Sequence, residues 1–326
     1  MSTRRQVIVA GISGLAVQSP AIAQGARPFR IGWLSLGRPG TPSPFLNAFR
    51  QGLKERGYVE GNNVVLEERS ADGSIERADQ MVTELVRLKV DVIVTQGGAA
   101  RSAYRLAGST PVVMGYSGDP VEAGFIDSLA KPGGTRTGMS FLAFELVAKR
   151  LEVLAQVLPS GPLIAVIADP EHPGEQAEFR RSELTARDLG IRLSRYPVRN
   201  VSELNAAFRA ISAAGVQALV VFPDAFTLEQ RETLAAFGLA RRLPTASGWS
   251  MFAESGFLLT YGPNLSASYA HLATYVDKIL KGARPADLPV ELPTSIEFVI
   301  NAKTAKAIGV KFPQAMLLRA DRVIEE

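Results

Sequence analysis

Two patterns of apolar residues alternate along the chain from residue 29 onward. Short apolar runs, such as VDVIVT at 90–95 and LIAVIA at 163–168, are typical of strands that are buried on both faces of a sheet. Between them lie segments of about 10–15 residues whose apolar positions recur every three or four residues, as at 75–89. This spacing predicts amphipathic helices. Strands that alternate with helices in this way form parallel sheets with right-handed crossovers.

The alternation assigns most of the chain to strands or helices. Predicted strands are 29–36, 64–67, 90–95, 111–116, 163–168, 192–198, 218–222 and 257–261. Predicted helices are 44–56, 75–89, 99–107, 144–158, 175–189, 203–214, 227–241 and 266–281. Asp119-Pro120 is expected to open one more helix, because Asp caps free N–H groups and proline suits the first helical position. Shorter segments at 297–300 and 304–308 end the fold.

The series of strands and helices occurs twice, with a break near residues 133–144. We therefore expect an α/β protein with two Rossmann-like lobes, each built on a parallel sheet. Lobe 1 is expected to contain 27–138 and 259–285, and lobe 2 to contain 139–258 and 286–326. Because the C-terminal pieces return to lobes already built, the chain should cross the hinge several times.

The first 23 residues differ from the rest and predict an export signal. Arg4 and Arg5 form a basic start, an apolar run follows at 7–17, and Ala21-Ile22-Ala23 matches a signal-peptidase site before Gln24. The apolar run is too short to span a bilayer. The arginine pair also fits a twin-arginine signal, so the general secretory (Sec) and twin-arginine (Tat) routes both stay open. We expect a soluble periplasmic protein; the alternative is an amphipathic or disordered N-terminus of a cytoplasmic protein.

Composition narrows the possible partners. The chain contains no cysteine, so disulfides, thiolate nucleophiles, Cys-based metal sites and an acylated anchor are excluded. Lys and Arg number 36 against 32 Asp and Glu, and two of the arginines lie in the predicted signal. This balance argues against nucleic acid as a partner, since such binding needs a clustered basic face.

Signatures of catalysis and of cofactor binding are missing from the sequence. The two histidines, His172 and His271, lack carboxylate partners at metal-site spacing, so no metal is expected. The G-x-S-x-G pattern of a nucleophile elbow is absent after both Gly115 and Gly248. The chain also has neither the G-x-G-x-x-G spacing of a dinucleotide site nor a P-loop. We therefore expect no catalytic residues and no cofactor.

Polar and glycine-rich loops follow the predicted strands, at the edge where open α/β sheets bind ligands. The candidate ligand-binding residues in these loops are Ser35, Gln96, Gly97, Gly98, Ser117, Asp119, Asp169, Asp224 and Trp249. Helix N-termini after Gly98 and Pro120 would present N–H groups to a carboxylate, and Asp119 and Asp224 could each accept from an ammonium or hydroxyl group.

Each of these residues also has a purely structural interpretation. Asp119 is first of all expected to be a helix cap, and Gly97-Gly98 serves equally well as a tight turn. Trp249 fits hinge packing as well as ligand stacking. Packing is the expected role of Phe226, and His172 is expected to be a solvated loop residue.

A colinear series of motifs adds a family resemblance over nearly the whole chain beyond the signal. The motifs are AFRQGL at 48–53, GYVEG at 57–61, LVRLKVDVIV at 85–94, GDPV at 118–121, KPGG at 131–134, AKRLE at 148–152, YGP at 261–263 and ATYVDKILKG at 273–282. In these residues the chain resembles the tryptophan/tyrosine-type family of ABC-transporter substrate-binding proteins. The resemblance implies a type I periplasmic-binding fold.

The resemblance also implies a function without catalysis. A cleft that closes about a hinge would capture a small carboxylate-bearing solute, such as an aromatic or branched amino acid or a related organic acid. The protein would act as a monomer and deliver the solute to ABC permease subunits, with ATP hydrolysed by a separate ATPase. A periplasmic sensor for a membrane receptor and an exported α/β enzyme are the alternatives.

One motif departs from the family pattern. Family members that resemble aromatic-amino-acid binders often carry Asp or Asn after Gly-x-Ser, whereas here Gly138-Met139-Ser140 is followed by Phe141. Ser140 remains a candidate ligand residue, but an amine partner is lost unless Asp119 or Asp224 replaces it. An aromatic or aliphatic carboxylate therefore competes with an α-amino acid as the expected ligand.

Overall fold

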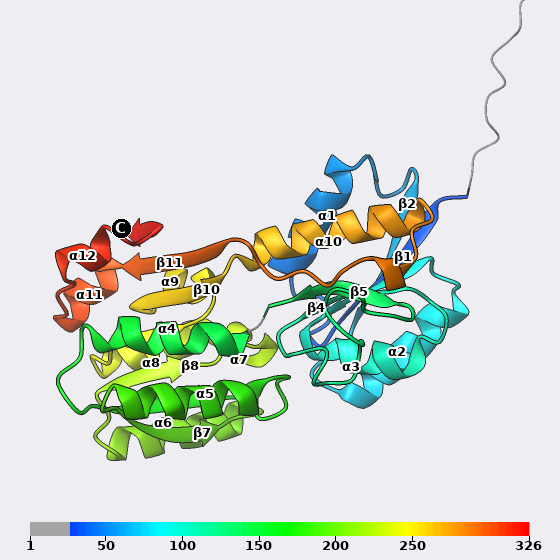
Figure 1. The fold of residues 1–326 in the computed structure, drawn as a ribbon. Coiled ribbons are helices and arrows are strands. Elements are labelled where there is room, and N and C mark those ends of the chain that lie inside the picture. Colours follow the sequence, from blue (N-terminus) through cyan, green and yellow to red (C-terminus); the bar gives the residue numbers. More distant parts are fainter. Residues whose placement is uncertain (1–26, 142, 326) are drawn as a thin grey trace, which may run out of the picture.

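The computed structural model describes residues 27–141 and 143–325. Two sheets form the centres of two lobes, which lie side by side in Figure 1. The predicted export signal lies outside the described residues, so it stays a prediction. Within 27–141 and 143–325, no helix is both long and apolar enough to cross a membrane.

The first lobe is built on a five-stranded parallel sheet in the order β2-β1-β3-β4-β5. Its strands are β1 (Phe29–Ser35), β2 (Val64–Ser70), β3 (Val92–Gln96), β4 (Val112–Tyr116) and β5 (Arg136–Ser140). The central strands β3 and β4 are almost wholly buried, because helices cover both faces of the sheet. These are α1 (Pro44–Glu55) and α10 (Leu265–Leu280) on one face and α2 (Ile75–Arg87) and α3 (Ala100–Leu106) on the other.

The second lobe is built on a seven-stranded sheet in the order β12-β11-β10-β9-β8-β6-β7. Its strands are β6 (Leu163–Ala168), β7 (Arg192–Pro197), β8 (Ala218–Val221), β9 (Thr245–Ser247), β10 (Leu259–Pro263), β11 (Ile296–Asn301) and β12 (Arg322–Ile324). All pair in parallel except β10 and β11, which are antiparallel. The prediction of an α/β fold with two Rossmann-like lobes is confirmed, with this one antiparallel pair added.

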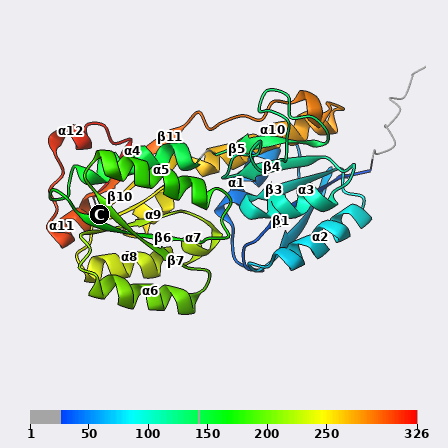
Figure 2. The ribbon, with the colours of Figure 1, turned by 60° about the horizontal axis from the view of Figure 1, so that its bottom comes forward.

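Alternate residues of β6 direct the second lobe's helices to opposite faces. Ile164 and Val166 pack with α4 (Ala143–Ala155) and α5 (Glu175–Asp188), whereas Ala165 and Ile167 pack with α6 (Val201–Ala213) and α8 (Arg231–Ala240). Figure 2 shows these two helix layers on either side of the sheet. The remaining helical elements are η1 (Gly97–Ala99), α7 (Ala225–Glu229), α9 (Ser250–Glu254), η2 (Pro285–Asp287), α11 (Ala302–Ile308) and α12 (Gln314–Leu317).

Two details differ from the predicted lobes. Residues 259–263 were expected in lobe 1, but they form β10, which pairs with β9 and β11 of the second sheet. The chain returns to the first lobe only after Asn264, where α10 packs beside α1 (Figure 1). Similarly, Val290 and Glu291 still bond to Leu129, Gly138 and Ser140 of the first lobe. Near the hinge, the chain passes from one lobe to the other within a few residues. The alternation of strands and helices does not specify at which residue it passes.

The prediction of a helix after Asp119-Pro120 is also wrong. Residues 120–124 form a turn, in which the Ala123 N–H donates to the Asp119 carbonyl and the Gly124 N–H to the Val121 carbonyl. Gly124 has φ +71°, a left-handed conformation that ends the helical path after one turn.

Candidate functional site

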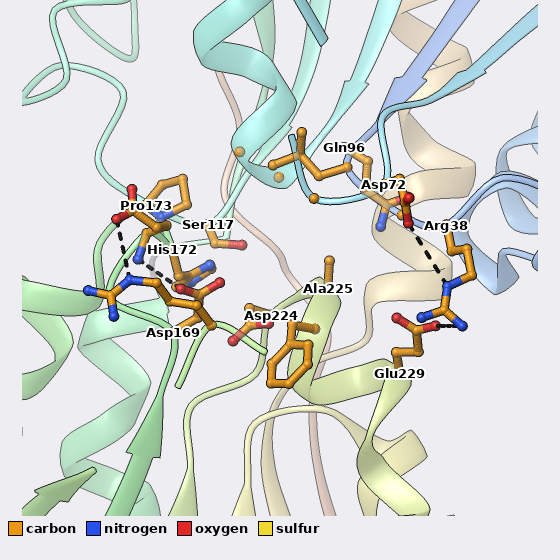
Figure 3. A pocket seen from close by; sticks show the side chains of 18 of the residues that line it. Arg38, Asp72, Gln96, Ser117, Asp169, His172, Pro173, Asp224, Ala225 and Glu229 are labelled. Carbon is orange, nitrogen blue, oxygen red and sulfur yellow. Dashed lines mark hydrogen bonds and ion pairs between the residues drawn. The ribbon is translucent and has the colours of Figure 1, made fainter. Parts of the chain in front are cut away.

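A cavity of about 470 Å³ lies between the lobes, at the carboxyl edges of both sheets (Figure 3). The first lobe lines it with the loop after β1, the turn after β3 and the start of α10, and the second with the loops after β6, β8 and β9. Its polar or charged side chains are Arg38, Asp72, Gln96, Arg101, Ser117, Asp169, Glu171, His172, Arg199, Asn200, Asp224, Glu229 and Gln230. The volume suits a small organic ligand.

The first-lobe wall is the turn from β3 into α3. Gly97 has φ +57°, a conformation that favours glycine, and a Cβ atom on Gly98 would lie 2.9 Å from Leu36 Cδ1, so the turn leaves little room for a side chain. Gln96 Oε1 is buried and has no hydrogen-bond partner in the described part of the chain. Arg101, one helical turn further on, also lines the cavity. This wall thus combines the Gln96 amide oxygen and a cation with half-buried glycine backbone.

Asp224 dominates the opposite wall. It follows β8 and caps α7 in a reciprocal capping box, with Oδ1 accepting from the Thr227 N–H at 2.9 Å and the Thr227 hydroxyl accepting from the Asp224 N–H at 2.9 Å. Its other oxygen, Oδ2, is buried and has no partner among the described residues. Burial, reinforced by the charge of Asp169, raises the pKa of Asp224 to about 6.

Asp169 and His172 belong to the loop after β6, and they lie beside Asp224 in the cavity wall (Figure 3). Asp169 Oδ1 accepts from the Glu171 N–H at 2.9 Å, and burial raises the pKa of the Asp169 carboxyl. The side chain of His172 is only 5% exposed, and its Nε2 lies 3.6 Å from Glu178 Oε1. The expectation that His172 is a solvated loop residue is therefore wrong, because α5 places a buried carboxylate behind the ring.

Aromatic side chains from both lobes form the apolar part of the cavity. Phe45, at the start of α1, lies 4.8 Å from Tyr269 of α10 and meets Trp249 edge-on at 5.8 Å between ring centroids. Phe141 and Phe226 complete this part of the lining. Trp249 packs on Phe45 of the first lobe and on Phe252 and also lines the cavity, so its stacking on a ligand stays a prediction.

Besides the aromatic contact of Phe45 with Trp249, two close approaches between the lobes lie around the cavity. Arg38 of the first lobe lies 4.0 Å from Asp72 and 3.2 Å from Glu229 of the second lobe, so it bridges the rim (Figure 3). On the other side, a Cβ atom on Gly174 would lie 3.2 Å from the Cα of Gly118. Gly174 has φ +89°, so this close contact needs a residue without a side chain.

The predicted site residues divide into two groups. Those that line the cavity are Gln96, Gly97, Gly98, Ser117, Asp169, Asp224 and Trp249. The Ser35 hydroxyl instead lies 3.3 Å from the Ser70 hydroxyl, and Ser140 donates to the Gly118 carbonyl at 2.9 Å. Asp119 caps its turn through the Val121 N–H at 2.8 Å and lines a second cavity of about 330 Å³. Direct contact with ligand stays a prediction for all ten.

Several lining residues were missed by the sequence analysis. Arg38, Phe45, Arg101, His172, Arg199, Glu229 and Tyr269 line the cavity, and so does Phe226, for which only packing was expected. Spacing could have indicated two of them, since Arg101 follows the Gly97-Gly98 turn by one helical turn and Phe226 comes two residues after Asp224. The others depend on how distant segments pack.

Comparisons with known proteins agree with this architecture. Residues 44–324 match the sequence model of the family described as "ABC transporter substrate binding protein". A "Tyrosine-binding protein" of Clostridioides difficile (strain R20291) is 23% identical over 265 residues, which cover 81% of this chain and 76% of that protein. The predicted family resemblance is thereby confirmed.

Solved structures show the same fold. A conserved domain protein from Vibrio cholerae superposes with a TM-score of 0.81 at 25% identity, covering 91% of this chain and 100% of that one. An ABC domain from Streptococcus pneumoniae in complex with L-Trp superposes with a TM-score of 0.80 at 23% identity and the same coverage. Since the family match spans most of the chain and these structures share its two-lobed fold, the chain belongs to the ABC transporter substrate-binding protein family.

Proposed function

We propose that this protein is an exported, monomeric solute-binding subunit that captures an α-amino acid with an aromatic or branched side chain. One observation carries the ligand assignment: Asp224 lines the cavity, and its Oδ2 is a buried carboxylate oxygen without a partner among the described residues. A buried acceptor of this kind is costly unless a ligand donor meets it. The ligand's ammonium group is the donor that best matches a carboxylate.

The first lobe supplies the matching site for the ligand's carboxylate. Gly97 and Gly98 present backbone at the turn before α3, Ser117 offers a hydroxyl, and Arg101 forms no ion pair with the described residues. An α-amino acid would therefore lie with its carboxylate toward the first lobe and its ammonium toward the second. Closing the lobes brings both walls onto one ligand, which makes binding depend on closure.

The aromatic lining and the relatives' ligands support the side-chain class. Phe45, Phe226, Trp249 and Tyr269 give the cavity an apolar end that suits an aromatic or branched side chain. A tyrosine-binding relative and a structural neighbour with bound L-Trp are consistent with this end of the cavity. An organic acid without an amine is disfavoured, because its apolar carbon would face Asp224 and Asp169 in place of a cation.

Calorimetry with paired ligands tests the proposed ligand class. We expect L-tryptophan, L-tyrosine or L-leucine to bind at least tenfold more tightly than its analogue without the amino group, because a charge-assisted hydrogen bond contributes about 1.5–3 kcal/mol. Equal affinity for the two members of each pair would contradict an ammonium site at Asp224. Mass spectrometry of ligand that co-purifies with the native protein would identify the solute itself.

Delivery to a membrane importer is the second part of the proposal. We expect ABC permease subunits to dock on both lobes in the ligand-bound form, with a separate ATPase supplying the energy. Deletion of the gene should abolish uptake of the radiolabelled solute, and the wild-type gene should restore it. Normal uptake in the deletion strain would favour a sensor, in which the same fold reports ligand to a membrane receptor.

A further inference from the structure

A buried carboxylate lies directly behind the cavity wall of the second lobe. Glu178, in the first turn of α5, is completely buried, and neither of its carboxylate oxygens has a hydrogen-bond partner among the described residues. An ionised carboxylate in such a place needs nearby positive charge. Two cationic side chains are available, His172 with Nε2 at 3.6 Å and the buried Arg150 of α4.

We propose that His172 is the positioning residue of the ammonium site, where Glu178 holds its ring as an imidazolium so that Asp224 can stay ionised in a buried place. This inference rests on the proposed function and deepens it, because it specifies the charge of the ligand group. His172 lines the ligand cavity on one side of the loop and the second cavity on the other. The charges of the buried Glu178 and of the cavity carboxylates Asp169 and Asp224 all act on its ring.

The charges around the ring add up to one unmatched negative charge. Arg150, whose Nε donates to the Tyr261 carbonyl at 3.3 Å, offsets Glu178. An imidazolium at His172 offsets one of the two cavity carboxylates, Asp169 or Asp224. The second cavity carboxylate is left to pair with a single cationic group of the ligand.

Two further carboxylates near His172 are already paired, and Arg101, which lines both cavities, is the cation assigned above to the ligand's carboxylate. Glu175 of α5, which also faces the ring, binds Arg195 of β7, and Glu171 lies 3.8 Å from Arg199 at the rim. These ion pairs are neutral, so the net charge around His172 stays at one unmatched negative charge. The site therefore matches a ligand with one ammonium group better than it matches a diamine or a neutral solute.

The pKa directions agree with this geometry. Burial disfavours the imidazolium, but Glu178, Asp224 and Asp169 outweigh it and raise the pKa of His172. In return, the charge of His172 lowers the pKa of Asp224 against the larger effect of burial. A neutral group at position 172 would therefore let Asp224 take up a proton at higher pH, and a protonated Asp224 no longer attracts a cation.

A ligand-free measurement tests the charge of the ring. The chain contains only two histidines, so an NMR titration of the imidazole signals shows two rings, and the His271→Gln variant assigns them. We expect His172 to titrate above its ordinary value in the wild type and at lower pH in Glu178→Gln than in the wild type. The proposal would be overturned if the His172 ring titrates at or below its ordinary value, or if Glu178→Gln leaves its titration unchanged.

A binding measurement tests the effect on the ammonium site, with L-tryptophan and indole-3-propionate as probes. We expect His172→Gln to weaken L-tryptophan binding about tenfold at pH 7.5, to move the acid limit of that binding to higher pH, and to leave indole-3-propionate no weaker. The matched control is His271→Gln. In the wild type the exposed His271 ring pairs with Glu291 at 2.8 Å on the surface of the molecule. The variant should bind both probes like the wild type.

The outcomes separate this proposal from the one on which it rests. Equal weakening of both probes in a folded His172→Gln protein would assign the residue a merely structural role and overturn the proposal. If the wild type binds none of L-tryptophan, L-tyrosine and L-leucine, the proposed ligand class fails, while the ring titration still supports or overturns the charge assigned to His172.

Discussion

Replacing Asp224 with Asn should stabilise the empty protein and weaken ligand binding at the same time. Asn is as good a cap as Asp, so the bond from the Thr227 N–H to Oδ1, 2.9 Å in the wild type, can be kept. What the substitution removes is a buried negative charge. In the folded protein the pKa of Asp224 is raised from 3.8 to about 6, chiefly by burial.

The magnitude follows from that difference in pKa. The folded protein holds the proton on Asp224 more tightly than the unfolded chain, so the stability present below pH 3.8 is lost as the pH rises through about 6. A difference of this size corresponds to roughly 3 kcal/mol at most. We therefore expect Asp224→Asn to raise the free energy of unfolding by about 1–3 kcal/mol at pH 7.5 and to change it little at pH 4.

Urea unfolding of the ligand-free proteins at these two pH values measures the stability, and calorimetry with L-tryptophan measures the affinity. Loss of a charge-assisted hydrogen bond should weaken binding about 10- to 100-fold. Asp188→Asn, at the exposed end of α5, is a control for the loss of one negative charge and should change neither quantity. A less stable Asp224→Asn protein at pH 7.5, or one that binds as tightly as the wild type, would refute the reasoning.

Three further predictions concern closure, the rim and export. Gly174→Ala should weaken L-tryptophan binding about tenfold and reduce the ligand-induced compaction seen by small-angle X-ray scattering. The reason is that a Cβ atom at position 174 would meet Gly118, and that φ is +89° there. Unchanged compaction would contradict this prediction. Arg38→Gln should lower the free energy of unfolding by at most about 1 kcal/mol, because the ion pair with Glu229 is exposed. The same substitution should lessen the salt dependence of the affinity for L-tryptophan. N-terminal sequencing of the secreted protein should begin at Gln24, and a protein that keeps its first residue would contradict the signal.

The local pattern of apolar residues predicted element types well because burial leaves a period in the sequence. It could not assign every element to a lobe. The strand at 259–263 and the helix that follows it are adjacent in the sequence, yet β10 pairs in the second sheet and α10 packs on α1 of the first lobe. Pairing partners depend on long-range contacts, which periodicity does not encode.

The candidate site shows the same division. Asp224 was found because it follows a buried strand, at the edge where parallel sheets bind ligands. His172 was missed because a lone histidine between polar residues and proline carries no signal of burial. Its environment is created when α5 packs on the sheet and brings Glu178 behind the ring.

These features connect the stability of the second lobe with its function. Among the described residues, Asp224 Oδ2 has no partner, and burial makes the ionised form of this carboxyl unfavourable. A ligand ammonium that pairs with this oxygen relieves the unfavourable charge at the moment of binding, so part of the affinity comes from strain already present in the empty protein. Because the first lobe must supply the carboxylate contacts of the same ligand, this relief is complete only when the lobes close. A ligand without an amine would gain the contacts of the first lobe but leave Asp224 unpaired, and it should therefore bind without fully favouring closure.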